Sequence, residues 1–112
     1  MSPHDRWRLQ HMIEAAESTQ KFISGRERAD LGRDQMLVFA IVRAIEIIGE
    51  AASKISEETR ISHPAIPWKA IIGMRNRLVH AYFDIDASIV WVAVTEEIPV
   101  LLGQLKTLAA SE

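Results

Sequence analysis

The 112-residue sequence contains no cysteine. This absence excludes a disulfide framework, a zinc ribbon and a thiol nucleophile, and it suits the reducing cytoplasm, where we expect the protein to act. No apolar run approaches about 18 residues, so we expect no membrane span. The first ten residues are polar and lack the apolar centre of a signal peptide, so we expect no secretion.

The sequence also lacks a large excess of charge of either sign, because 15 acidic and 13 basic residues leave a formal net charge of -2. This value argues against a strongly basic protein that coats nucleic acid without specificity. Apolar residues make up 48% and charged residues 25% of the chain, which is typical of a folded globular protein. A chain of this length predicts a single domain, residues 1–112.

Strand signals are absent as well, because apolar residues recur at helical and not at alternating spacing. The pattern predicts an all-α, up-down helical bundle of four to five helices with short connections. Ser2 and Pro3 are suited to open the first helix, and Gly49 should permit close helix approach. Pro99 should kink or break the last helix. The expected helices run from Pro3 to Ser24, from between Asp30 and Asp34 to about Ile55, from Trp68 to about His80, and from Ala87, capped by Asp86, to about Ala109; Ser56–Ile66 should be a connector with at most a short helical turn.

One segment lacks carboxylates entirely, because none occurs between Glu58 and Asp84. Residues 59–83 hold four basic and no acidic residues, a local charge of +4, together with histidine and tyrosine. Arginine offers a planar, permanently charged fork for phosphate oxygens, and histidine can move a proton near neutral pH. The segment is therefore either a phosphate site or a helix end whose cations complement the helix dipole.

The two side chains best suited to phosphodiester chemistry, Arg75 and His80, are five residues apart. On one continuous helix they would point about 140° apart and would not meet on one ligand. Either the helix ends near His80, or a second copy of the chain completes the site across a two-fold axis.

Arg75 to Tyr82 has the form R-x4-H-x-Y, preceded by IPW at residues 66–68 and IIGM at residues 71–74. Together with IIGEAA at residues 47–52, this string closely resembles the HEPN superfamily and, within it, the HepT-like toxins encoded beside a minimal nucleotidyltransferase antitoxin (MntA-like). The resemblance covers about Asp5 to Leu108. It implies a small helical bundle that acts as a metal-independent endoribonuclease, needs no cofactor and builds its active site at a homodimer cleft.

The resemblance also implies roles for individual residues. Arg75 would bind phosphate, His80 would act as general acid or base, and Asn76 would orient the phosphate or His80. Tyr82 would accept AMP from the partner nucleotidyltransferase, which silences the toxin. The charge and bulk of AMP would fill the site that RNA needs.

A polar stripe on the second expected helix, residues 43, 46, 50 and 53, adds two supporting candidates. Glu46 or Glu50 could line the cleft and pair with Arg75 or orient His80; the alternative is an ordinary ion-paired surface. We interpret Arg77 as solvated. The histidines have no ligand-like spacing, so we expect no metal site.

The leading functional hypothesis is therefore the RNA-cleaving toxin of a type VII-like toxin–antitoxin system. The alternatives are a non-catalytic nucleotide- or RNA-binding module and a structural partner subunit of a nucleotidyltransferase.

Overall fold

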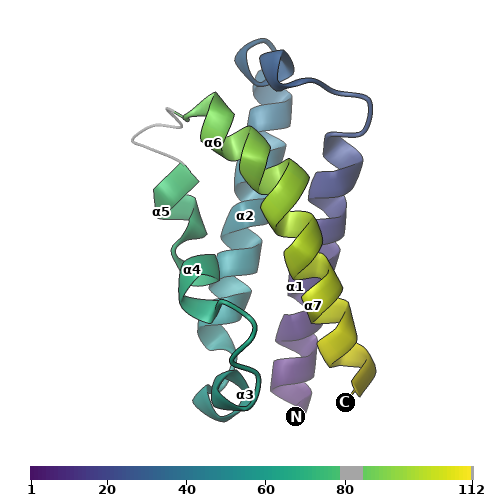
Figure 1. Ribbon diagram of the computed structural model, residues 1–112, viewed down its shortest axis with the longest axis vertical. Coiled ribbons are helices and arrows are strands. Elements are labelled where there is room, and N and C mark those ends of the chain that lie inside the picture. The colour runs from purple at the N-terminus through teal and green to yellow at the C-terminus, as the bar shows by residue number, and fades with distance from the viewer. Residues whose placement is uncertain (79–84, 112) are drawn as a thin grey trace.

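The computed structural model describes residues 1–78 and 85–111, and these form a bundle of helices. Three long helical segments lie alongside one another (Figure 1), and the shorter elements close the two ends and one flank. The predicted all-α bundle is confirmed. In chain order the elements are α1 (Pro3–Phe22), the 3-10 helix η1 (Arg28–Gly32), α2 (Gln35–Lys54), α3 (Glu57–Ser62), α4 (Trp68–Ile72), α5 (Met74–Leu78), α6 (Ala87–Val92), the π-helical turn η3 (Ala93–Glu97) and α7 (Ile98–Ser111).

The first two long helices each begin with a residue whose side chain accepts a hydrogen bond from a backbone N–H of the first turn, which has no partner within the helix. The Ser2 hydroxyl accepts a hydrogen bond from the Asp5 N–H at 3.1 Å, and the Asp34 carboxylate accepts one from the Leu37 N–H at 3.1 Å. The predicted cap at Ser2 is confirmed, and of the two residues that could cap the second helix, Asp30 and Asp34, it is Asp34 that does so. Helix α1 ends at Phe22, two residues before the expected Ser24, and Gly25 then turns the chain with a φ of 73°.

Helix α2 is the central element, because α1, α4, α5 and η1 all pack against it. Its apolar arc is continuous with the core, where Ile41, Ile45 and Ile48 are almost fully buried. A Cβ atom at Gly49 would lie 3.4 Å from the carbonyl oxygens of Ile71 and Ile72. The prediction that Gly49 permits close approach is confirmed, and the partner it admits is the carboxyl end of α4.

The segment between α2 and the last helix follows the prediction in one place and departs from it in another. The expected connector contains a short helix, α3, which the Ser56 hydroxyl caps by accepting from the Thr59 N–H at 3.3 Å. The single helix expected from Trp68 to His80 is wrong, because Gly73 separates α4 from α5. Glycine is a poor helix former, and here it lets the chain change direction beside α2.

The last helix continues through Pro99 without breaking. Its regular hydrogen bonding is replaced by the wider π-helical turn η3, which ends two residues before the proline. A proline at position 99 has no N–H for the Thr95 carbonyl and its ring crowds that carbonyl, so the π-helical turn accommodates it. The predicted distortion therefore takes the form of a π-helical turn within one helix.

The whole helix Ala87–Ser111 is long and apolar enough, by length and composition alone, to cross a membrane. This finding departs from the expectation that no segment would qualify. Core helices also meet this criterion, and the fully buried residues here recur on one face that packs against α1. They are Val90, Ala93, Val94, Ile98 and Leu105.

Candidate active site

The first half of the R-x4-H-x-Y motif lies on the short helix α5. Met74 and Leu78 are buried and share one face of the helix, so they fasten α5 to the core. Arg75 and Arg77 are two residues apart and therefore point about 200° apart, toward opposite flanks of α5. The described part of α5 is thus anchored by two apolar side chains.

Each arginine of α5 meets a carboxylate from a different element. Nε of Arg75 lies 3.3 Å from Oε2 of Glu46 on α2. Nη1 of Arg77 lies 3.0 Å from Oε1 of Glu97 in η3. The π-helical turn carries Glu97 to Arg77, so Arg77 is ion-paired, and it remains exposed as its interpretation as a solvated side chain predicts.

The two supporting glutamates on α2 have different partners. Glu46 contacts Arg75, whereas Oε1 of Glu50 lies 3.7 Å from Nζ of Lys54 on the same helix. Glu50 thus belongs to an ordinary ion-paired helix surface. The pattern that pointed to both glutamates could not separate them, because only the position of α5 decides which of them an arginine reaches.

The remaining motif residues are less informative. Asn76 is exposed, and its side chain makes no hydrogen bond within residues 1–78 and 85–111. His80 and Tyr82 lie outside the described residues. The structure therefore brings together Arg75 and Glu46 from the set of expected site residues.

The basic segment 59–83 does not form one cationic patch. Nε and Nη2 of Arg60 donate to the carbonyl oxygens of residues 55, 52 and 53 at 3.1, 3.0 and 2.6 Å. Arg60 therefore caps the carboxyl end of α2, which is the dipole-complementing alternative of the sequence analysis. Arg77 pairs with Glu97. Two of the four cations of this segment are thus held by groups within the fold.

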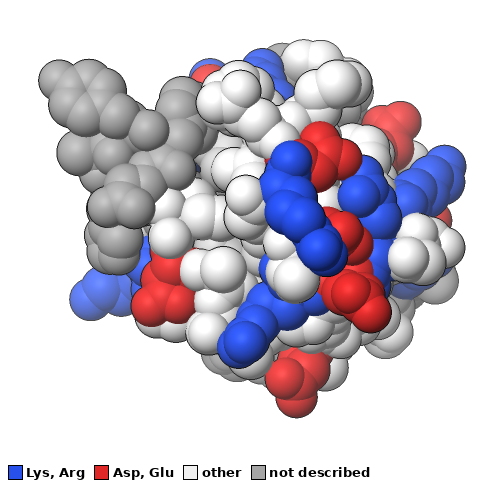
Figure 2. Space-filling model, turned by 90° about the horizontal axis from the view of Figure 1, so that it is seen from above, with Lys and Arg blue, Asp and Glu red and all other residues white. Residues whose placement is uncertain are grey.

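A second charged region lies at the end of the molecule seen in Figure 2, where Lys and Arg side chains alternate with Asp and Glu side chains. The segment between α1 and α2 supplies several of these pairs. Arg26 pairs with Asp34, and Arg33 lies 3.3 Å from Asp30. The hydrogen bond and charge of Arg26 lower the pKa of Asp34 below its ordinary value. This end therefore presents mixed charge and not a single-sign surface for a polyanion.

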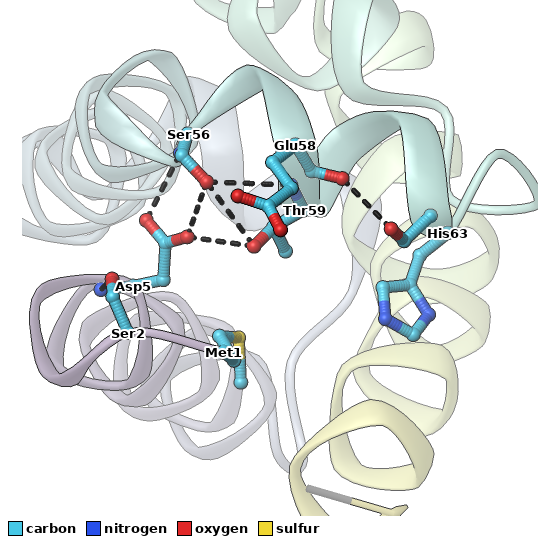
Figure 3. A pocket seen from close by; sticks show the side chains of 8 residues that line it. Met1, Ser2, Asp5, Ser56, Glu58, Thr59 and His63 are labelled. Atoms are coloured by element: carbon cyan, nitrogen blue, oxygen red, sulfur yellow. Dashed lines mark hydrogen bonds between the residues drawn. The ribbon is translucent and has the colours of Figure 1, made fainter.

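Sequence reasoning missed a buried polar cluster between α1 and α3, at a pocket of about 260 Å³ (Figure 3). Asp5 is only 3% exposed. Its carboxylate accepts hydrogen bonds from the Ser56 N–H at 2.9 Å, the Ser56 hydroxyl at 2.6 Å and the Thr59 hydroxyl at 2.7 Å. Burial raises the pKa of Asp5, but these hydrogen bonds outweigh burial and hold the pKa below its ordinary value.

The same cluster shows why local motifs mislead. The S-x-x-D pattern at the start of the chain predicts that Asp5 serves the cap of α1, whereas its carboxylate instead binds α3 across 51 residues of sequence. No local sequence pattern predicts the contact of Asp5 with Ser56 and Thr59. Among residues 1–78 and 85–111, no group of histidines and acidic residues could hold a metal ion.

The all-α bundle agrees with the fold that the resemblance to the HEPN superfamily implies. The family model described as "Ribonuclease HepT-like" matches residues 12–108. The chain therefore belongs to the HepT-like ribonuclease family, and it is an endoribonuclease. This result disfavours the non-catalytic alternatives.

Curated relatives cover nearly the same length. "Putative RNase TTE0752" of Caldanaerobacter subterraneus subsp. tengcongensis is 38% identical over 104 residues, which is 93% of each chain. "Probable ribonuclease HepT" of Thermococcus cleftensis is 39% identical over 100 residues, covering 89% of this chain and 91% of the relative. No solved structure matches this chain.

Proposed function

We propose that this chain is the toxin of a type VII-like toxin–antitoxin pair and cuts RNA in the cytoplasm without a metal ion, using Arg75 and His80. The observation that carries the proposal is the environment of Arg75. It stands on an anchored helix, half exposed, and within the described residues only its Nε is engaged. Among the described residues no group occupies its terminal amines, and these are the atoms that can fork a phosphate.

The proposed reaction is attack by a ribose 2′-oxygen on the adjacent phosphorus. A bond forms between the 2′-oxygen and phosphorus, the bond from phosphorus to the 5′-oxygen breaks, and a 2′,3′-cyclic phosphate results. His80 takes the 2′-proton as general base, and a second His80 across a dimer cleft gives a proton to the leaving 5′-oxygen. Arg75 stabilises the extra negative charge of the transition state.

A homodimer is part of the proposal, because the resemblance to the HEPN superfamily implies an active site at a homodimer cleft. Support comes from α2, where Met36 and Phe39 are exposed and share a helix face with Arg43 and Glu46. A second copy seated on this face would cover the two apolar side chains and bring its own Arg75 toward the first. Replacing Phe39 with glutamate should weaken the dimer, as measured by sedimentation, and RNA cleavage should fall with it.

Regulation in the proposal falls on Tyr82. Its phenolic oxygen attacks the α-phosphorus of ATP bound by the cognate nucleotidyltransferase, AMP is attached and pyrophosphate leaves. The added bulk and negative charge stand two residues from His80 and oppose RNA binding. Intact mass of the protein co-expressed with its partner should rise by one or more AMP groups, and Tyr82→Phe should remove the increase. An unshifted mass with an active partner would count against this step.

The decisive experiment measures cleavage of RNA by the purified chain in EDTA. We expect cleavage by the wild-type protein, and none by Arg75→Ala or His80→Ala at unchanged helical content. Growth arrest on induction should depend on the same two residues. Undiminished cleavage by His80→Ala would refute the mechanism, and RNA binding without turnover would favour a binding module.

A further inference from the structure

The two ion pairs that hold α5 are similar in distance and exposure but differ in the guanidinium atom that makes the contact. The distances are 3.3 Å for Arg75–Glu46 and 3.0 Å for Arg77–Glu97, and all four side chains are between one-third and one-half exposed. Only Arg75 is the arginine that defines the R-x4-H motif, whereas Arg77 stands at one of its variable positions. The Arg77–Glu97 pair is therefore a matched reference for the pair that involves the motif.

The atom through which Arg75 is held distinguishes its pair. A guanidinium group can bind an oxyanion along its side, through Nε, or at its end, through Nη1 and Nη2. Glu46 contacts Nε and so occupies the side of Arg75. Within the described residues, no hydrogen bond engages Nη1 or Nη2. The contact therefore fixes the guanidinium without using the end that forks a phosphate.

Glu46 is itself carried by a rigid stretch of backbone. Its neighbours Ile45 and Ile48 are almost fully buried, and Gly49 brings this part of α2 against the carboxyl end of α4. Since α4 leads directly into α5, the distance between Glu46 and Arg75 is set by packing. A carboxylate held in this way can define the direction in which a long, flexible arginine points.

We propose that Glu46 is a positioning residue for RNA cleavage, which aims the terminal amines of Arg75 at the scissile phosphate. This inference rests on the proposed function of Arg75. The contact also places a negative charge beside the RNA, so Glu46 opposes ground-state binding while it supports the transition state. Removing it should therefore lower kcat and, at the same time, lower KM.

Two substitutions separate geometry from charge. Glu46→Gln keeps an oxygen that accepts from Nε, so kcat should stay within about threefold of wild type, while KM falls because the charge is gone. Glu46→Ala removes both, so kcat should fall about 10- to 100-fold, the loss expected when a catalytic group is misplaced, without a rise in KM. Glu97→Gln and Glu97→Ala are the matched controls and should leave both constants unchanged.

The assay measures cleavage of a short, fluorescent, single-stranded RNA of mixed sequence in EDTA. The dissociation constant of its fully 2′-O-methylated analogue and the thermal midpoint of each variant are measured in parallel. If Glu46→Ala and Glu97→Ala lower kcat equally, and in proportion to the fall in the thermal midpoint, the Arg75–Glu46 pair has only a structural role. Unchanged kcat in Glu46→Ala, or weaker binding of the analogue, would overturn the inference.

These failures are distinguishable from failure of the proposed function. If Arg75→Ala abolishes cleavage and Glu46→Ala does not change it, only the role of Glu46 is refuted. If the wild type does not cleave RNA, or if Arg75→Ala still does, both the proposed function and the role of Glu46 are refuted.

Discussion

Removing the carboxylate of Asp5 should destabilise the whole bundle, although Asp5 lies far along the chain from the helix it binds. Its two oxygens receive one backbone N–H and two hydroxyl groups from Ser56 and Thr59. These bonds fasten the start of α1 to α3, a helix of six residues that is too short to be stable alone. Asp5→Ala leaves all three donors without their acceptor.

The magnitude follows from the number and kind of bonds lost. A hydrogen bond to a charged group contributes about 1.5–3 kcal/mol. The pocket beside the cluster opens toward Met1 and His63, so water can replace part of what the two hydroxyls lose. The backbone N–H of Ser56 recovers least. We therefore expect Asp5→Ala to lower the free energy of unfolding by about 2–4 kcal/mol, and Asp5→Asn by somewhat less.

The pH dependence of that loss tests its cause. The pKa of Asp5 is lower in the folded protein than its ordinary value of 3.8. Its stabilisation is therefore complete above the unfolded pKa and is lost as the pH falls through the folded pKa. The gap in stability between wild type and Asp5→Asn should close in that acid range. Asp30 and Asp34 titrate there too, but they are common to both proteins and cancel in the difference.

The assay is urea unfolding followed by circular dichroism, at neutral pH and at steps down to about pH 2 for both proteins. A gap below about 0.5 kcal/mol at neutral pH, the range of ordinary surface substitutions, would refute the reasoning. So would a gap that does not change as the pH falls. Thr59→Val provides a control, because it removes one donor and keeps the carboxylate.

Three further substitutions test the packing around the site, each by urea unfolding. Asp34→Ala removes the cap of α2 and should lower the free energy of unfolding by about 1–2 kcal/mol. The control is Gln35→Ala, which changes an exposed residue that does not cap the helix and should have a smaller effect. Gly49→Leu forces bulk against the carbonyl oxygens of Ile71 and Ile72 and should cost about 1–3 kcal/mol, whereas the helix propensity of alanine should offset much of the cost in Gly49→Ala. Leu78→Ala empties a fully buried position under α5 and should cost about 2–5 kcal/mol; a smaller loss would mean that α5 is not fastened through its apolar face.

The fold could be predicted because its main signals are local. Ser2 and Asp34 cap helices through hydrogen bonds to residues three positions ahead, and the apolar spacing of the long helices marks their buried faces. The break at Gly73 is not local in this sense. A glycine within a helical pattern is compatible with either a continuous or an interrupted helix, and packing of α4 and α5 against α2 decides between them.

The candidate site depended still more on distant partners. A charge count assigns +4 to residues 59–83, but it cannot show that Arg60 turns back onto carbonyl oxygens of α2 or that Arg77 reaches Glu97. Those contacts satisfy two of the four cations within the fold. The cationic surface is therefore smaller than the count suggests, which makes the placement of Arg75 more important than the number of positive charges. We propose that RNA cleavage depends on the direction in which the Arg75 guanidinium points, and in the described structure the carboxylate that contacts this guanidinium is that of Glu46.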